Sequence, residues 1–203
     1  PLIVRQDGTK FGKSEGENIW LSPERTSPYR LYQHLLNVPD SDVELLLLRL
    51  TTVPVDECLE VAATHAEHPE RREGQRRLAR EVTSLVHGAA VIEEIERASA
   101  ILFGSAVEEA GEEAYRLLAS ELPVTEVPST ELVGLDPVEL FTRAGLGRSK
   151  GEVRRNLSGY HVNQVPLAER LDGPGAPLAE ADLRHGRYVL LRRSKAHHLV
   201  VSV

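Results

Sequence analysis

The sequence predicts a mainly α-helical protein, in which a helical bundle is followed by a small α+β unit. Three observations carry this prediction. Residues 28–120 repeat apolar positions at helical spacing, with Pro and Gly at the breaks. Residues 123–134 are polar and keep no sustained period. Short strand-like stretches then follow among turn residues. The 203 residues suffice for one or two domains with cores of modest size.

The helical part begins with two short helices. The pattern predicts them over Pro28–Asn37 and Ser41–Thr51, joined by Val38-Pro39-Asp40. Consecutive leucines at 45–48 make the second helix apolar on most sides, so we expect it to be the central packing helix.

Further helices are expected before the polar segment. One runs from Asp56 to about Pro69, and a long helical pattern covers Glu70–Phe103, which His87-Gly88 should bend or break. A short helix is predicted over Glu108–Ser120.

These elements predict a helical domain over 27–122, a linker over 123–135 and a compact α+β domain over 136–203. In the last domain, Asp136-Pro137 caps a helix that ends at Ala144, and Ser149 caps a second helix that runs to about Ser158, with a turn at Gly145 and Gly147 between them. The strand-like stretches are Tyr160–Gln164, Tyr188–Arg193 and His197–Val203.

Charge is divided unevenly along the chain, whose formal net charge is −7. Residues 136–203 hold eleven Lys and Arg against seven Asp and Glu, a net charge of +4. The rest holds 13 basic and 24 acidic residues, a net charge of −11. This asymmetry indicates that the carboxyl-terminal part faces phosphates while the remainder does not.

The basic residues of this last domain cluster on one predicted helix and one strand end. Lys150 and Arg154 are four residues apart and share a helix face, with Arg155 beside them. The neighbouring strand ends with further cations, at Arg192, Arg193 and Lys195. A solvated helix face is the alternative interpretation, and the clustering within a net positive domain favours RNA contact. Phosphate contacts of this kind supply affinity rather than sequence selectivity.

The segment Asp7–Ser14 has the composition of a loop that wraps a polyphosphate. Lys10 and Lys13 supply mobile cations, Gly12 allows close backbone approach, and Ser14 adds a hydroxyl. The spacing of a P-loop is absent, and a solvated turn is the alternative interpretation.

The sequence that follows this loop, NIWLSPERTSPYRLYQHLLNVPD at 18–40, closely resembles bacterial tyrosyl-tRNA synthetases, and residues 10–14 then correspond to the class I KMSKS motif. LVHGAA and AILFG match the helical anticodon-binding domain of that family. GLGRSKGEVRRNLSGYHVNQ resembles the RNA-binding fold shared with ribosomal small-subunit protein four. That match includes Ser149, Arg154, Arg155, Val162 and Asn163, and it departs from the pattern at Val153 and Ser158.

The resemblance implies a tyrosine–tRNA ligase, which activates tyrosine with ATP, with magnesium expected, and transfers it to tyrosine tRNA. It assigns Lys10, Gly12 and Lys13 to ATP, gives Lys10 and Lys13 the stabilisation of pyrophosphate, and gives Ser14 a supporting role. Residues 1–26 are then the signature loop and tail of a class I catalytic domain. The chain holds neither a HIGH-type motif nor a tyrosine pocket, so we expect the 203 residues alone to be inactive. The family dimerises through the absent domain, so a homodimer is expected of the full enzyme.

The resemblance also implies that Asp40 reads the first anticodon base and that the terminal domain meets the long variable arm of the tRNA. For Asp40, an N-cap role at the helix beginning at Ser41 is the alternative. For the whole chain, the alternative is a non-catalytic RNA-binding protein with a vestigial synthetase loop.

The remaining sequence features narrow the class of protein. Cys58 is the single cysteine, which excludes an internal disulfide, and we expect it to be a small buried hydrophobe. No apolar run has membrane-spanning length and no export leader opens the chain, so a cytoplasmic location without membrane partners is expected. His197 and His198 are adjacent on a predicted strand and point to opposite faces, so no metal site is expected.

Overall fold

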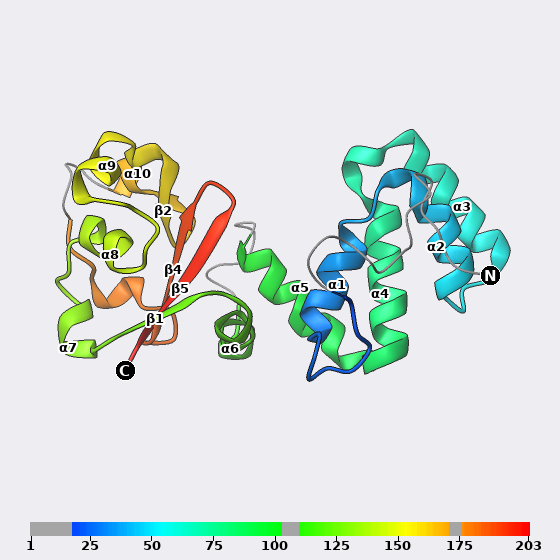
Figure 1. Cartoon of the computed structure of the whole chain (residues 1–203), viewed down its shortest axis with the longest axis horizontal. Coiled ribbons are helices and arrows are strands. Elements are labelled where there is room, and N and C mark those ends of the chain that lie inside the picture. Colours follow the sequence, from blue (N-terminus) through cyan, green and yellow to red (C-terminus); the bar gives the residue numbers. More distant parts are fainter. Residues whose placement is uncertain (1–17, 103–109, 171–175) are drawn as a thin grey trace. The chain divides into compact units, whose positions relative to one another are not determined.

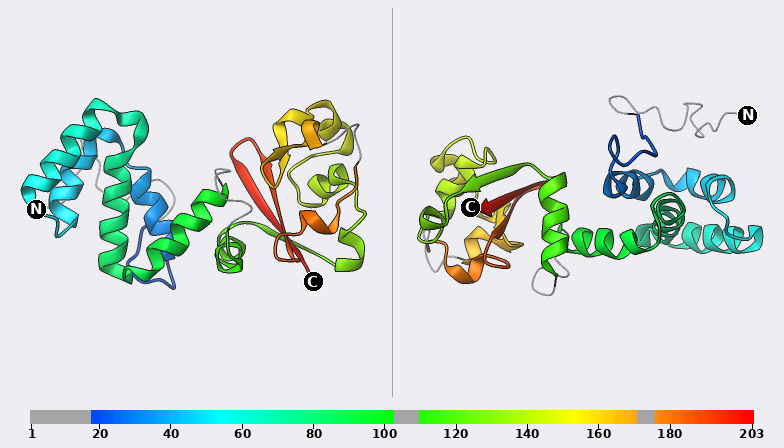
Figure 2. Two further views of the ribbon diagram at one scale, coloured as in Figure 1. Left: turned by 180° about the vertical axis from the view of Figure 1, so that it is seen from behind. Right: turned by 90° about the horizontal axis from the view of Figure 1, so that it is seen from below.

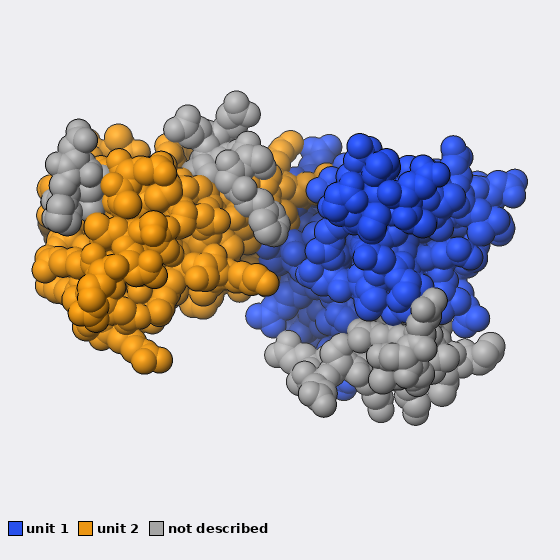
Figure 3. Space-filling view, turned by 90° about the horizontal axis from the view of Figure 1, so that it is seen from above, with its two compact units in different colours: residues 1–95 blue, residues 96–203 orange. Residues whose placement is uncertain are grey.

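A computed structural model of the protein describes residues 18–102, 110–170 and 176–203. The chain divides into two compact units, residues 1–95 and 96–203, which are coloured separately in Figure 3. We describe each unit by itself. The predicted fold class, a helical bundle followed by a small α+β unit, is confirmed. The division into 1–26, 27–122, 123–135 and 136–203 stays a prediction.

From Pro28 on, the described residues of unit 1 form helices joined by short turns (Figure 1). Its elements in chain order are α1 (Pro28–Leu36), the 3₁₀ turn η1 (Asp40–Asp42), α2 (Val43–Leu50), α3 (Val55–Glu67), the 3₁₀ turn η2 (Pro69–Arg71), α4 (Glu73–His87) and the start of α5 (Ala90–Leu102).

Helix α4, rather than α2, is the element that contacts the other helices of the bundle, because it packs against α1, α2 and α3. Leu78 of α4 is fully buried. In α2, Leu46 and Leu47 are buried, whereas Leu48 stays 38% exposed. The expectation that α2 is central is therefore wrong: its four leucines cover more than one face, and only part of that surface finds a partner. Cys58 is buried and unpaired, as expected.

The predicted break in the long helical pattern is confirmed at Gly88. Gly88 has φ of 90°, a conformation that costs glycine little and other residues much. Helix α4 ends at His87 and α5 begins two residues after the glycine, at Ala90. One amphipathic stretch of sequence thus becomes two helices.

Unit 2 contains the end of α5, then α6 (Glu112–Glu121), β1 (Val124–Val127), α7 (Ser129–Leu132), α8 (Pro137–Arg143), α9 (Lys150–Arg155), the 3₁₀ turn η3 (Leu157–Gly159), β2 (Tyr160–Val162), β3 (Val165–Pro166), α10 (Leu167–Arg170), the 3₁₀ turn η4 (Glu180–Asp182), β4 (Tyr188–Arg193) and β5 (Ala196–Ser202). Both predicted caps are confirmed. Asp136 accepts from the amide of Val138 at 2.9 Å, and Ser149 accepts from the amide of Glu152 at 3.2 Å.

The described strands of unit 2 form one mixed sheet in the order β1-β5-β4-β2-β3. Strand β1 pairs in parallel with β5, and the other pairs are antiparallel. Helices α7, α8, α9 and α10 lie on one side of the sheet and α6 on the other, as both Figure 1 and the left view of Figure 2 show.

Side chains alternate between these two layers along each strand. Val189, Leu191 and Val200 face the core that α8 and α9 complete. On the other side, Tyr115 of α6 stacks on Tyr188, with ring centroids 5.5 Å apart. The sheet is therefore covered on both faces by helices of the same unit.

The predicted linker over 123–135 contains regular structure. Residues 124–127 form β1, which pairs with β5, and α7 follows at once. Residues 124–127 of the predicted linker are therefore part of the sheet of unit 2. A strand of four residues is too short to show a period, and its partner lies more than 70 residues further along the sequence.

Strands β2 and β3 are joined by a two-residue turn at Asn163-Gln164, where both residues have positive φ, 48° and 67°. This is the geometry of a type I′ hairpin turn, in which asparagine is well tolerated. Asn163 is buried, donates from Nδ2 to the carbonyl of Asp182 at 2.8 Å and accepts at Oδ1 from the amide of Leu190 at 3.0 Å. The motif asparagine thus joins the hairpin to η4 and β4.

Candidate nucleic-acid interface

Asp40 lies in unit 1 on the turn that leads from α1 into α2. It directly follows Pro39 and opens the 3₁₀ turn η1. Its side chain is 61% exposed. No side-chain hydrogen bond caps η1 or α2, so the N-cap interpretation of Asp40 is wrong.

Two buried side chains hold one oxygen of the Asp40 carboxylate instead. Nε2 of His65 on α3 lies 3.1 Å from Oδ1, and Nε2 of Gln75 on α4 donates to the same oxygen. The ionised carboxylate only accepts, so Nε2 of His65 is the donor. His65 and Gln75 are 3% and 1% exposed. In the described residues, Oδ2 has no partner and is the acceptor that remains.

The backbone around this carboxylate is closely packed. A Cβ added at Gly74 would lie 2.6 Å from Cγ1 of Val43 and 2.9 Å from Cγ of His65, so glycine is what lets α4 approach the imidazole ring. Arg72 donates from its guanidinium to the carbonyl of Leu36 at 2.6 Å, which ties the end of α1 to the start of α4. The Asp40 turn is thereby held to both helices.

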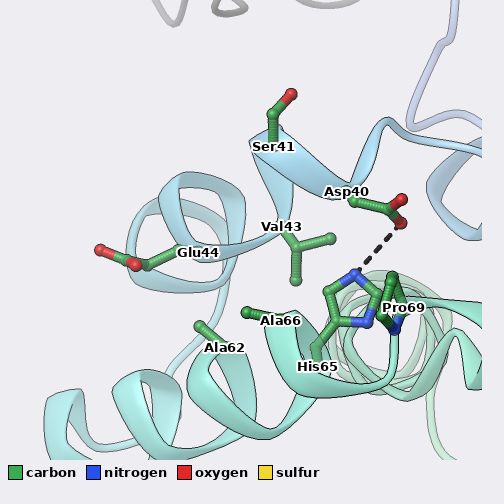
Figure 4. Close-up of a pocket in the computed structure, with 8 residues that line it drawn as sticks. All are labelled: Asp40, Ser41, Val43, Glu44, Ala62, His65, Ala66 and Pro69. Atoms are coloured by element: carbon green, nitrogen blue, oxygen red, sulfur yellow. Dashed lines mark hydrogen bonds and ion pairs between the residues drawn. The ribbon is translucent and has the colours of Figure 1, made fainter.

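The carboxylate stands at the rim of an open pocket of about 390 Å³, shown in Figure 4. Its lining residues are Asp40, Ser41, Val43, Glu44, Ala62, His65, Ala66 and Pro69. The lining combines apolar side chains with a hydroxyl and a second carboxylate, that of Glu44. An exposed acceptor beside such apolar side chains can pair with the N–H groups on the edge of an unstacked base.

In unit 2, the two cations that share a face of α9 meet carboxylates of α8 and its cap. Nζ of Lys150 lies 3.0 Å from Oε2 of Glu139, and the guanidinium of Arg154 lies 3.3 Å from Oδ2 of Asp136. Both cations remain about half exposed. Hydrogen bonds from Lys150 and then Arg143 hold the pKa of the Glu139 carboxyl below its usual value, so it stays ionised at neutral pH.

Arg192 and Arg193 point to opposite faces of the sheet. Arg193 faces α9 and is fully engaged: it donates to the carbonyl of Leu146 at 2.8 Å and to Glu152 at 2.7 Å, and its guanidinium lies 5.4 Å from the ring centroid of Tyr160. Arg192 pairs in register with His161, on the other face. The structure therefore does not bring the predicted basic residues onto one surface.

Arg155 and Lys195 are exposed and have no ion-pair partner in the described part of the chain. Arg148, which precedes the cap of α9, is exposed and equally without an acidic partner for its side chain there. Sequence reasoning missed Arg148, although its place in the GLGRSK segment is a usable signal. These cations are available to a phosphate without first leaving a carboxylate.

The predicted loop residues Lys10, Gly12, Lys13 and Ser14 lie outside the described residues. Within 18–102, 110–170 and 176–203, no three His, Cys, Asp or Glu side chains gather as a metal site would require. None of the helices in the described ranges is both long enough and apolar enough to cross a membrane.

The structure thus comprises a helical unit that presents a supported carboxylate and an α+β unit whose helix α9 carries exposed cations. The family model of the class I tRNA synthetases (W and Y) matches residues 1–104, so the chain belongs to that family.

Its relatives include tyrosine–tRNA ligases. Those of Anaeromyxobacter dehalogenans strain 2CP-1 and Roseiflexus castenholzii are 41% and 36% identical to it, and each match covers 100% of this chain and 48% of the relative. The chain therefore spans about half the length of these relatives, and the matching part is C-terminal in them.

A crystal structure of a C-terminally truncated mitochondrial tyrosyl-tRNA synthetase from Coccidioides posadasii matches 47% of this chain and 24% of its own, at 36% identity and a TM-score of 0.40.

Proposed function

We propose that the chain is the tRNA-binding, C-terminal portion of a tyrosine–tRNA ligase. The observation that carries the proposal is the match of its whole length to tyrosine–tRNA ligases at 35–41% identity. Each of the curated relatives reported above is a ligase, which favours this function over a non-catalytic RNA-binding protein with a vestigial loop.

Unit 1 supplies base recognition in this proposal. Asp40 accepts at Oδ2 from an N–H group on the first anticodon base, and the apolar wall of the pocket beside it lies against the base. A contact to a base carries sequence information, so unit 1 selects among tRNAs.

Unit 2 supplies contacts to tRNA phosphates, and we assign these contacts to the long variable arm of the tRNA. Arg155 and Lys195 bind phosphates directly, and Lys150 and Arg154 do so in exchange for Glu139 and Asp136. Arg192 contributes from the other face of the sheet, and Arg193 orients Glu152 and Tyr160 beneath α9. This unit raises affinity for RNA without reading bases.

In the complete ligase, the tyrosine carboxylate attacks the α-phosphate of ATP and pyrophosphate leaves. Lys10 and Lys13 neutralise the charge that develops on pyrophosphate, Gly12 lets the loop backbone approach it, and Ser14 supports the loop. Magnesium accompanies ATP as substrate. The proposal extends to a cytoplasmic homodimer that forms through the catalytic domain.

Filter binding tests the proposal with tyrosine tRNA and a version with an exchanged anticodon. Asp40→Ala should weaken binding of the tyrosine tRNA alone, whereas Arg155→Ala should weaken both. Glu60→Ala is the matched control, because Glu60 is an exposed carboxylate on α3 without a partner in the described residues. Equal affinity of the unmodified chain for both tRNAs and for an unrelated RNA hairpin would contradict the function.

A further inference from the structure

We infer that His65 and Gln75 are positioning residues, which aim the Asp40 carboxylate at the anticodon base and so determine how well that base is discriminated. The inference rests on the proposed base contact of Asp40. It adds the two residues that orient the contact.

The geometry limits which part of the carboxylate can meet a ligand. His65 and Gln75 both donate to Oδ1, so the two acceptor positions of that oxygen are occupied from within unit 1. Oδ2 is left as a single outward acceptor in a fixed direction. A base edge that presents an N–H group there is bound, and one that presents a carbonyl or a ring nitrogen meets like charge.

The burial pattern argues that these donors chiefly serve Asp40, with Nε2 of Gln75 also donating to the carbonyl of Val38 at 3.4 Å. Asp40 is 61% exposed and would be hydrated without protein partners. His65 and Gln75 are buried, and Nδ1 of His65 and Oε1 of Gln75 have no hydrogen-bond partner in the described residues. An unsatisfied buried polar atom costs stability, and apolar side chains of similar size would avoid that cost.

Gly74 adds independent support. Its missing Cβ leaves room for the imidazole at the start of α4, a position where alanine favours a helix more. Gly74 thus lowers the local helix propensity, and His65 and Gln75 each leave a buried polar atom without a partner in the described residues. In return, one carboxylate is held in a fixed orientation at the pocket rim. Such local costs are typical of functional sites.

The test compares discrimination, the ratio of the two dissociation constants for tyrosine tRNA and its anticodon-exchanged version, in the full chain. His65→Phe and Gln75→Met keep size and remove the donor. Each should reduce discrimination about three- to tenfold, the value of one ordinary intramolecular hydrogen bond, while binding of the exchanged tRNA stays unchanged. In an Asp40→Ala background neither should cause further loss. His65→Gln, which returns an amide donor, should recover part of the discrimination.

Thermal melting separates this role from a structural one. We expect Gln75→Met to melt close to the temperature of the unmodified chain, because it removes both an unpaired buried oxygen and the hydrogen bond to the Val38 carbonyl. Gln75→Met therefore tests the positioning role even if His65→Phe fails to fold. Unchanged discrimination in Gln75→Met, with Asp40→Ala impaired, overturns the positioning role alone. Unchanged discrimination in Asp40→Ala overturns the base contact and this inference with it. The phosphate contacts proposed for unit 2 are tested separately, by the salt dependence of binding, and do not depend on this result.

Discussion

Oε2 of Glu139 accepts a hydrogen bond from Nζ of Lys150 at 3.0 Å, so the first cation of α9 already has an anionic partner before any phosphate arrives. A phosphate must displace that partner or bind beside it. Carboxylates of the protein thus compete with RNA for the basic face, and this competition can be measured.

Glu139→Gln should raise affinity for every RNA tested by about two- to fivefold, because it frees Lys150 and removes a repulsive charge next to the phosphates. The gain should shrink as salt increases. Filter binding at low and moderate salt measures it. Glu126→Gln on β1 removes an exposed carboxylate that has no ion-pair partner among the described residues, and it should change affinity less. An equal gain in both variants would indicate only a long-range effect of net charge.

The salt dependence of RNA binding should show how much each cation of α9 contributes to phosphate contact. Arg155→Ala should lower the slope of log affinity against log salt by roughly 0.7–0.9, the effect of one lost phosphate contact. Lys150→Ala and Arg154→Ala should lower it less, because each cation is partly neutralised by Glu139 or Asp136 before RNA binds. Unchanged slopes in all three variants would mean that this face is merely solvated.

Asn163→Ala should destabilise unit 2 by about 2–4 kcal/mol. The substitution leaves the buried amide of Leu190 without its acceptor and places alanine at positive φ. Urea unfolding followed by circular dichroism measures the loss. Asn163→Gly is the control, since glycine adopts the positive φ at little cost but removes the same side-chain hydrogen bonds. If Asn163→Gly loses no free energy, the turn geometry rather than the Asn163 side chain accounts for the effect.

Unit 2 should lose stability as pH falls below about 6.5, the usual histidine pKa. Burial lowers the pKa of His198 and of His197, and burial together with the nearby Arg192 lowers that of His161. The folded state therefore binds these protons less readily than the unfolded state, and protonation favours unfolding. Stability is complete above pH 6.5 and declines as the unfolded chain becomes protonated.

Urea unfolding from pH 8 to pH 5.5 tests this dependence, and His198→Gln should flatten it. The buried His198 accepts from or donates to the Thr125 hydroxyl at 2.8 Å, a bond that glutamine can also make. An unaltered pH profile in the variant would assign the dependence to other groups.

Lys13→Ala in the complete ligase should lower tyrosyl-adenylate formation by roughly 100- to 1000-fold and leave tyrosine affinity nearly unchanged, because the charge it meets develops mainly in the transition state. Pyrophosphate exchange kinetics measure both quantities. A loss confined to tyrosine affinity would contradict the role. The 203-residue chain alone should show no exchange.

Local signals in the sequence were enough for the elements with a strong period or a clear cap. The strand over Tyr188–Arg193 and the caps Asp136 and Ser149 were predicted as they occur. Strand β1 could not be predicted from local signals, because only its pairing with β5 makes it a strand.

The candidate site divides in the same way. Asp40 was indicated by the resemblance, but its partners His65 and Gln75 lie 25 and 35 residues away, and no local pattern connects them. The strand alternation that separates His197 from His198 also separates Arg192 from Arg193, so that separation was predictable from the same rule. The carboxylate partners of the α9 cations could not be predicted from the sequence, because they depend on how α8 packs against α9.

The place of β5 between β1 and β4 has a consequence during protein synthesis. The helices of unit 1 precede the sheet residues in the sequence and are synthesised first, whereas β1 must wait for β5, the last of the described strands and the one it pairs with. A ribosome that stops before Ala196 therefore leaves a nascent chain with a folded helical unit and two unpaired strand edges, on β1 and β4. Such edges invite aggregation and chaperone binding until β5 is made.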